Sequence, residues 1–273
     1  MSAQGQRGAF YGARECIADA FGYDRRQETL RQLCKRMCAA PIPRADYVAL
    51  VANLYELVGS NCRQQSTSKQ NWRWKPQTRL NSENRDKETL LERAVAILTE
   101  NGHLPDWSNQ IPVISGHATK QQKKCAVDLA RRSGERLELI ELKWQSDTPT
   151  YAAFEILLYG LAYVFCRLSL RYQDRSTMGA SVISLNVLAP ASFYKGINLG
   201  RLESGLSQGF SALMRKRLSE KPAGELRLLQ IPSDFTMPFE TGADVMKGCG
   251  RKAPGPTGLA VIDALRRIEP VYP

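Results

Sequence analysis

The sequence predicts an α/β fold with a mixed central sheet flanked by helices, and with a helical module at its N-terminus. Apolar residues recur at helical spacing in the first 60 residues, and helix-type and strand-type segments alternate further along the chain. Strand segments that come first as a group and then alternate with helices imply a mixed sheet covered by helices on both faces. The 273 residues, 43% hydrophobic and 24% charged, exclude a disordered or collagen-like chain.

The N-terminal module is expected to span residues 1–75. Two proline residues, Pro41 and Pro43, separate its two clearest helical patterns, and the polar stretch 60–70 has the composition of a linker. The apolar positions that define these two patterns are Leu30, Leu33 and Cys34, and then Tyr47, Leu50, Val51, Leu54 and Leu57.

The central part of the chain, residues 76–232, supplies the predicted sheet. Its first helix is expected to end near Gly102, which suits a C-cap. The residues after 232 are expected to form an irregular extension, 233–273, because 232–256 is rich in Pro and Gly, with a terminal helix over 257–267. The expected order is helix 87–101, strands 110–115, 123–132 and 136–144, helix 151–168, strand 181–188, helix 199–218 and strand 225–231.

Composition also limits the compartment and the class of protein. No run of about 18 apolar residues predicts a membrane span, and the first residues lack the apolar region of a secretory signal, so a cytoplasmic protein without membrane contact is expected. The seven cysteines are dispersed, with no pair at the two-residue spacing of a zinc knuckle. They are expected to be small buried side chains in a reduced compartment.

The charge of +11 lies outside the middle of the chain: residues 1–87 carry +7, residues 88–179 carry 0 and residues 180–273 carry +4. Such an excess favours a polyanionic partner. Segment 69–79 interleaves Trp72 and Trp74 with Arg73 and Lys75, which is typical of stacking on bases and pairing with phosphates. The alternative is that both tryptophans pack on the core. Three more residues expected at a DNA backbone, unless they are merely solvated, are Lys120, Lys123 and Lys124.

The candidate chemistry depends on one predicted turn. Gly134 suits the first central position of a two-residue type II′ hairpin loop, which would place Ser133 opposite Arg136. Counting back along both strands makes Asp128 the direct partner of Glu141, with their Cβ atoms roughly 5 Å apart. Lys143 lies two residues beyond Glu141 and therefore projects from the same face.

Two neighbouring carboxylates on an otherwise apolar sheet repel each other unless a cation lies between them. Mg²⁺ prefers one or two carboxylates together with waters and phosphate oxygens. Lys143 would then orient or deprotonate a water, or neutralise charge on a phosphate. These parts indicate metal-assisted phosphodiester hydrolysis. The alternative is that Asp128, Glu141 and Lys143 form a salt-bridge ladder on an exposed sheet face.

Residues 87–231 resemble the PD-(D/E)XK nuclease superfamily in the order of their elements and in two motifs. Asp128 in CAVDLA matches the acid of the second core strand, and Glu141 with Lys143 in LIELKW matches the E-x-K of the third. Val127 stands where the motif has its proline. The resemblance implies a restriction-endonuclease-like αβββαβ core, and restriction, phage defence and repair are all compatible with it.

The family often adds an acid from the first core helix. Glu92 is the preferred candidate because it lies in the middle of the predicted helix, whereas Glu88, in the first turn, can simply complement the helix dipole. Some exonuclease branches carry Gln-x-x-x-Tyr on the following helix, and this chain has Glu155 and Tyr159 at that spacing. A hydrogen-bonded buried carboxylate is the alternative interpretation of Glu155.

The leading hypothesis is therefore a Mg²⁺- or Mn²⁺-dependent nuclease that acts on DNA, although the sequence does not distinguish DNA from RNA. Asp128 and Glu141, helped by Glu92, would bind the metal. A second hypothesis is a catalytically inactive nucleic-acid-binding protein of the same fold. A third is an interaction protein in which the helix over 151–168 forms an oligomer interface, as in a homodimer.

Overall fold

A six-stranded sheet forms the centre of the protein in a computed structural model that describes residues 8–63, 68–114, 125–168, 176–250 and 252–272. The strands are adjacent in sequence order, from β1 to β6. They are β1 (Trp107–Pro112), β2 (Ala126–Ser133), β3 (Arg136–Leu142), β4 (Val182–Pro190), β5 (Ala223–Ile231) and β6 (Glu269–Pro270).

The direction of the strands changes at β3. β1, β2 and β3 pair antiparallel, whereas β4 runs parallel to both β3 and β5, and the short β6 is antiparallel to β5. The parallel steps require long crossover connections, and helices supply them. The predicted α/β class with a mixed sheet is thus confirmed.

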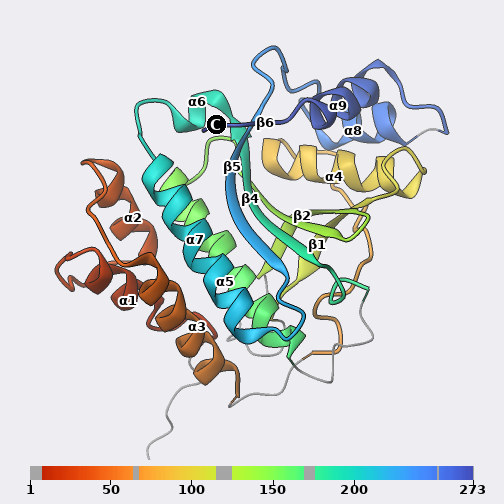
Figure 1. The fold of residues 1–273 in the computed structure, drawn as a ribbon. Helices are drawn as coiled ribbons and strands as arrows, with labels where there is room; N and C mark the ends of the chain where they lie inside the picture. Colours follow the sequence, from red (N-terminus) through yellow and green to blue (C-terminus); the bar gives the residue numbers. More distant parts are fainter. Residues whose placement is uncertain (1–7, 64–67, 115–124, 169–175, 251, 273) are drawn as a thin grey trace, which may run out of the picture.

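Helices cover both faces of this sheet (Figure 1). α3, α5 and α7 lie on one side of it, and α4, α8 and α9 lie on the other. The helices of the described residues are α1 (Ala13–Ala20), α2 (Leu30–Cys38), α3 (Tyr47–Arg63), α4 (Lys87–Glu100), α5 (Pro149–Arg167), α6 (Ala191–Tyr194), α7 (Gly200–Arg217), α8 (Gly242–Cys249) and α9 (Pro256–Arg266).

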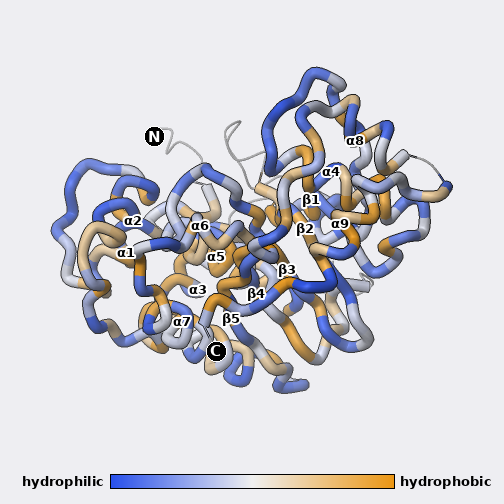
Figure 2. The backbone as a smooth tube through the Cα atoms, turned by 90° about the horizontal axis from the view of Figure 1, so that it is seen from above, coloured by the Kyte–Doolittle hydropathy of each residue, from blue (hydrophilic) through white to orange (hydrophobic). Residues whose placement is uncertain are grey.

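The hydrophobic core has one cluster on each face of the sheet. The larger cluster joins α1, α2 and α3 to α5, α7 and the sheet, so the N-terminal helices share a core with the strands. The smaller one joins α4, α8 and α9 to the opposite face. Figure 2 shows the most hydrophobic backbone in the middle of the molecule, with hydrophilic segments along the outer loops.

α5 is the central helix of the larger cluster. Within the described residues, it is the one helix long and apolar enough to cross a membrane, and 83% of that span is buried inside the protein, as in the core helix of a soluble protein. It approaches β4 closely at Gly160, where any Cβ atom would collide with the Leu185 side chain. Glycine therefore allows α5 to lie directly on the sheet.

Two differences between the predicted and the observed elements concern the C-terminal extension and the first strand. The stretch expected to be irregular contains α8, which begins with a capping box between Thr241 and Asp244. The first strand begins at Trp107, three residues before its predicted start, because Ser108 and Asn109 pair with β2 although they are polar.

Candidate active site

The predicted hairpin between β2 and β3 forms as expected. Gly134 has a φ of 59°, and the Glu135 φ is not positive, which is the pattern of a type II′ turn. Ser133 pairs with Arg136, and the ladder continues to Leu129 and Ile140. The next step in this register brings Asp128 beside Glu141, and Asp128 Oδ2 accepts a hydrogen bond from the Leu142 amide at 3.0 Å.

Asp128 lies where the strand ladders are interrupted. On its other side, β1 pairs Asn109 with Leu129 and Ile111 with Val127, leaving out Gln110 opposite Asp128. Gln110 has a φ of 47°, a conformation uncommon for residues other than glycine and often found at functional sites. The strand backbone is therefore distorted beside the carboxylate that carries the predicted chemistry.

Lys143 is held between two carboxylates in the buried interior. Its Nζ donates a hydrogen bond to Glu141 Oε1 at 2.7 Å and forms an ion pair with Glu155 Oε2 at 3.1 Å. Glu141 is 4% exposed and Lys143 is 6% exposed. The alternative interpretation, an exposed salt-bridge ladder, is therefore wrong for these two residues, because helix α5 covers this part of the sheet and contributes Glu155.

The second oxygen of Glu141, Oε2, is buried and receives no hydrogen bond from an N–H or O–H group in the described part of the chain. The neighbour of the Glu141 carboxyl is the Asp128 carboxyl, with which it can share a hydrogen bond only when one of the two is protonated. An unpaired buried carboxylate oxygen costs free energy that a bound cation would recover. Asp128, which is partly exposed, lies beside it. This pair fits Mg²⁺, which needs only one or two carboxylates with waters and phosphate oxygens completing its shell.

The ionisable groups of this region shift one another's pKa values. Burial raises the pKa of Asp128 to about 6, although Lys143 lowers it. Burial and the neighbouring Asp128 raise the pKa of Glu141 well above its usual value. Burial opposes the charge of Lys143, but Glu141, Glu155 and Asp128 raise the pKa of its ammonium group above the ordinary value. Lys143 is therefore charged at neutral pH.

Glu92 of α4 binds two residues of β1, the strand that pairs with the Asp128 strand β2. Its Oε1 accepts a hydrogen bond from Asn109 Nδ2 at 2.6 Å, and its Oε2 accepts one from Gln110 Nε2 at 3.1 Å. Burial raises the pKa of Glu92 to about 7, with Arg93 opposing the shift and Asp128 adding to it. Among the described residues, no three His, Cys, Asp or Glu side chains form a group able to hold a metal ion. Glu92 as a third ligand stays a prediction.

The two auxiliary acids have separate surroundings. Glu155 Oε1 lies 3.3 Å from the Tyr151 hydroxyl and 3.5 Å from the Tyr159 hydroxyl, one helical turn away on either side. Glu88 Oε1 accepts hydrogen bonds from the Trp144 amide at 2.7 Å and from Ser146 Oγ at 2.6 Å. Glu155 therefore belongs to the Lys143 cluster, whereas Glu88 fixes the backbone that follows Lys143.

The basic segment divides between the core and the surface. Trp72 is completely buried and packs edge-on against Tyr163, with ring centroids 5.2 Å apart. Its predicted stacking on bases is wrong, because its ring has no exposed face. Trp74 is half-buried beside the Arg132 guanidinium, and Arg73 and Lys75 are exposed. The predicted DNA contacts Lys120, Lys123 and Lys124 lie outside the described residues.

Sequence reasoning missed three polar residues of this region. Asn109 and Gln110 bind Glu92, and their adjacent amides in the apolar strand sequence WSNQIP are a usable indication. Asp147, with a φ of 63°, forms an ion pair with Arg31 of α2 at 3.0 Å and lies 4.0 Å from Lys143 Nζ. The N-terminal module therefore reaches the edge of the site.

Comparisons of the chain with protein-family models, with curated proteins and with solved structures find no match.

Proposed function

We propose that this protein is a metal-dependent phosphodiester hydrolase, a DNA nuclease with a restriction-endonuclease-like core. The observation that carries the proposal is the group of Asp128, Glu141 and Lys143, in which two carboxyl groups adjoin and one buried oxygen of Glu141 receives no hydrogen bond from any donor among the described residues. The order of elements also supports it: α4 precedes the antiparallel β1, β2 and β3, and α5 leads to β4, which is parallel to β3.

Asp128 and Glu141 would hold the cation, because their carboxylates are adjacent and Lys143 occupies only one oxygen of Glu141. When bound, Mg²⁺ or Mn²⁺ supplies positive charge to phosphate oxygens and lowers the pKa of water. Water adds to phosphorus, and the bond from phosphorus to the leaving sugar oxygen breaks. That oxygen takes up a proton, and the products are a phosphomonoester and an alcohol.

Lys143 has a defined role in this proposal. Its ammonium group is charged and is fixed by Glu141 and Glu155. A charged amine cannot accept a proton, so Lys143 would stabilise negative charge on the phosphate and orient the water instead of acting as a base. Tyr151 and Tyr159 hold Glu155 in place from the same helix.

Cleavage of plasmid DNA with Mg²⁺ or Mn²⁺ tests the proposal. We expect the wild-type chain to nick or linearise the plasmid and Asp128→Ala to abolish cleavage, with an unchanged circular dichroism spectrum. Asp46→Ala, which removes an exposed carboxylate at the start of α3, is the matched control and should cleave normally. Full activity of Asp128→Ala contradicts the proposal.

A second candidate function is a nucleic-acid-binding protein of the same fold that does not cut. The position of Lys143 favours it, because an ammonium group between Glu141 and Glu155 compensates these acids without a metal. Retention of DNA without cleavage under any divalent cation, together with thermal unfolding that Mg²⁺ and Mn²⁺ leave unchanged, would select this second function.

A further inference from the structure

A small cavity beside the candidate active site has the composition of an anion site. Its volume is about 180 Å³, several times the roughly 30 Å³ of a water molecule in the liquid. Of the residues that the structure describes, two with cationic side chains and three with amide side chains line it, and none with a carboxylate does. The lining residues are Gln70, Arg73, Lys75, Gln77, Gln110 and Pro112.

The cations of this cavity are available to a ligand. Among the described residues, Arg73 donates one hydrogen bond, from Nη1 to Gln70 Oε1 at 3.0 Å, and its other guanidinium nitrogens bond to none of them. No carboxylate of the described residues forms an ion pair with Arg73 or Lys75. A guanidinium group beside an ammonium group and amide donors suits the oxygens of a phosphate.

The backbone that presents these side chains, residues 73–80, forms a strap along the outer edge of β1, which begins after a turn at Trp72, where φ is 60°. The Trp72 amide donates to the Pro112 carbonyl at 2.8 Å, and the Gln77 amide donates to Asn109 Oδ1 at 2.7 Å. The burial of Trp72 anchors one end of the strap. Such anchoring lowers the entropy cost of holding a ligand.

The side chains of the strap point alternately toward the protein and toward the solvent. Trp74, Pro76, Thr78 and Leu80 are half-buried, and the residues between them are exposed: Arg73, Lys75, Gln77 and Arg79. Successive outward side chains on an extended backbone lie about 6.6 Å apart. A row of cations suits an extended polyanion better than one small anion.

Gln110 connects the cavity to the candidate active site. It lines the cavity, it donates to Glu92 Oε2 at 3.1 Å, and it lies opposite Asp128 in the interrupted ladder of β1 and β2. A phosphate in the cavity is therefore separated from the Glu92 carboxylate by one side chain.

We propose that the cavity between the strap and Gln110 binds a backbone phosphate of the nucleic acid, flanking the phosphodiester that the carboxylates act on. The assignment of this phosphate to a substrate rests on the proposed function. Arg73 and Lys75 hold the phosphate charge, and Gln77 and Gln110 contribute amide donors. Trp72 acts only by fixing the strap.

The test measures binding of a fluorescently labelled DNA duplex by fluorescence anisotropy, with EDTA present and with salt varied from about 50 to 200 mM. We expect the double variant Arg73→Ala/Lys75→Ala to bind about tenfold more weakly than wild type. We also expect the slope of log K against log salt to become shallower by about 1, the change expected when the protein neutralises one phosphate fewer. Lys35→Ala/Arg44→Ala, which removes the same two residue types from exposed N-terminal positions, should bind like wild type.

The same variants are then compared in cleavage with Mn²⁺. Arg73→Ala/Lys75→Ala should raise KM with little change in kcat, because the phosphate contact is made in both the ground state and the transition state. Equal affinity and equal slope for this variant and the control overturn the inference. Competition by inorganic phosphate as strong as that by DNA phosphate also overturns it, because the cavity would then be a small-anion site. A wild type that binds DNA with the expected slope and never cleaves overturns the proposed function and leaves the phosphate site intact.

Discussion

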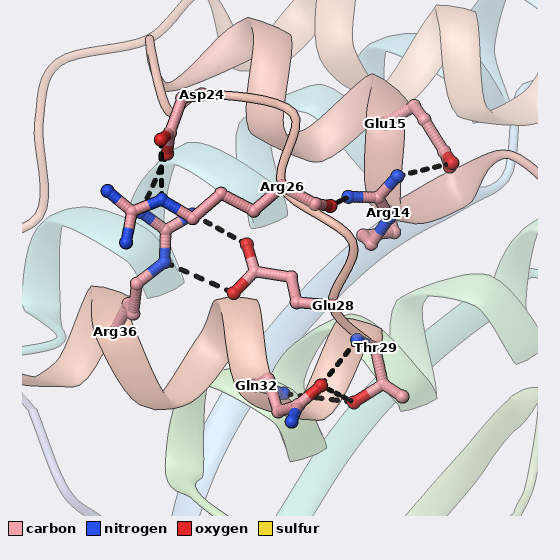
Figure 3. A network of polar contacts seen from close by, with 8 residues as sticks. All are labelled: Arg14, Glu15, Asp24, Arg26, Glu28, Thr29, Gln32 and Arg36. Atoms are coloured by element: carbon pink, nitrogen blue, oxygen red, sulfur yellow. Dashed lines mark hydrogen bonds and ion pairs between the residues drawn. The ribbon is translucent and has the colours of Figure 1, made fainter.

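Two clusters of charged residues in this protein are built on opposite plans. The first, which we call the exposed cluster because Asp24 and Arg26 at its centre lie in the solvent, joins α1 to α2 with three basic and three acidic side chains (Figure 3). Its other members are half-buried: Arg14, Glu15, Glu28 and Arg36. The second, which we call the buried cluster, places the carboxylates of Glu141, Glu155 and Asp128 around Lys143, with Glu92 on the far side of Asp128, where it forms an ion pair with Arg93.

The pKa values of the two clusters shift in opposite directions. In the exposed cluster, the hydrogen bond from Arg26 lowers the pKa of Asp24. In the buried cluster, burial raises the pKa of Asp128 to about 6 and that of Glu92 to about 7. Charges that are paired in water support the fold a little, whereas buried acids in excess destabilise it. Such acids are typical of sites where chemistry requires them.

The largest expected difference between the clusters is in cleavage. Removing the cation of the buried cluster with Lys143→Ala should lower kcat by about 100-fold to 1,000-fold, the usual loss for one group that stabilises transition-state charge. Single-turnover cleavage of labelled DNA measures it. Arg36→Ala, which removes a cation from the exposed cluster, is the control and should cleave like wild type. An equal loss of kcat in both variants would contradict a special role of the buried cluster in cleavage.

The next effect is on the unfolding free energy, which a substitution in the site is expected to raise instead of lower. Asp128→Asn should abolish cleavage and yet stabilise the fold at pH 8 without metal. The folded pKa of Asp128 is about 6, above its usual 3.8, so its charge opposes folding above pH 6 and has no effect below about pH 4. A shift of this size corresponds to roughly 3 kcal/mol, and partial exposure reduces it to about 2 kcal/mol.

Urea unfolding at pH 8 and at pH 4, in EDTA, checks this prediction. The gain in unfolding free energy should be present at pH 8 and absent at pH 4, because the folded protein holds a neutral side chain at pH 4 in both variants. The asparagine oxygen can still accept the hydrogen bond of the Leu142 amide. Destabilisation at both pH values would show that the Asp128 charge supports the fold.

The smallest expected effects are on the unfolding free energy of variants in and next to α2, the helix that carries Arg36. Thr29 caps α2 in a capping box with Gln32, so Thr29→Ala should cost about 1 kcal/mol of unfolding free energy and leave DNA cleavage unchanged. Arg36→Ala should cost less than this, because ion pairs contribute little where one member reaches the solvent, and Arg36 is half-buried between the exposed Asp24 and the half-buried Glu28. Thermal unfolding of the two variants ranks them, and a larger loss for Arg36→Ala would contradict the comparison.

The sequence alone predicts the part of the site that depends on turn geometry and on the strand period. Gly134 and the two-residue period of strands predict the neighbourhood of Asp128 and Glu141, which the hairpin register bears out. The burial of Lys143 depends on Glu155, which α5 brings from another part of the chain. No local pattern contains that contact.

Long-range contacts also explain the errors. Trp72 is buried because its amide bonds to Pro112 and its ring meets Tyr163, and both partners are distant in sequence. Helix α8 lies in a stretch rich in Pro and Gly, and its first residue, Gly242, bonds to the Asn84 carbonyl. The capping pair of Thr241 and Asp244 was the local indication that could have predicted this helix.

One amide side chain ties the strap to the acid of α4. Asn109 accepts a hydrogen bond from the Gln77 amide at 2.7 Å, and its Nδ2 donates to the Gln77 carbonyl at 3.1 Å and to Glu92 Oε1 at 2.6 Å. Both hydrogens of that nitrogen are used, so Asn109 has no donor in reserve. Three separate stretches of the chain, the strap, β1 and α4, are therefore joined through one side chain, and displacing Asn109 breaks bonds to both of the others.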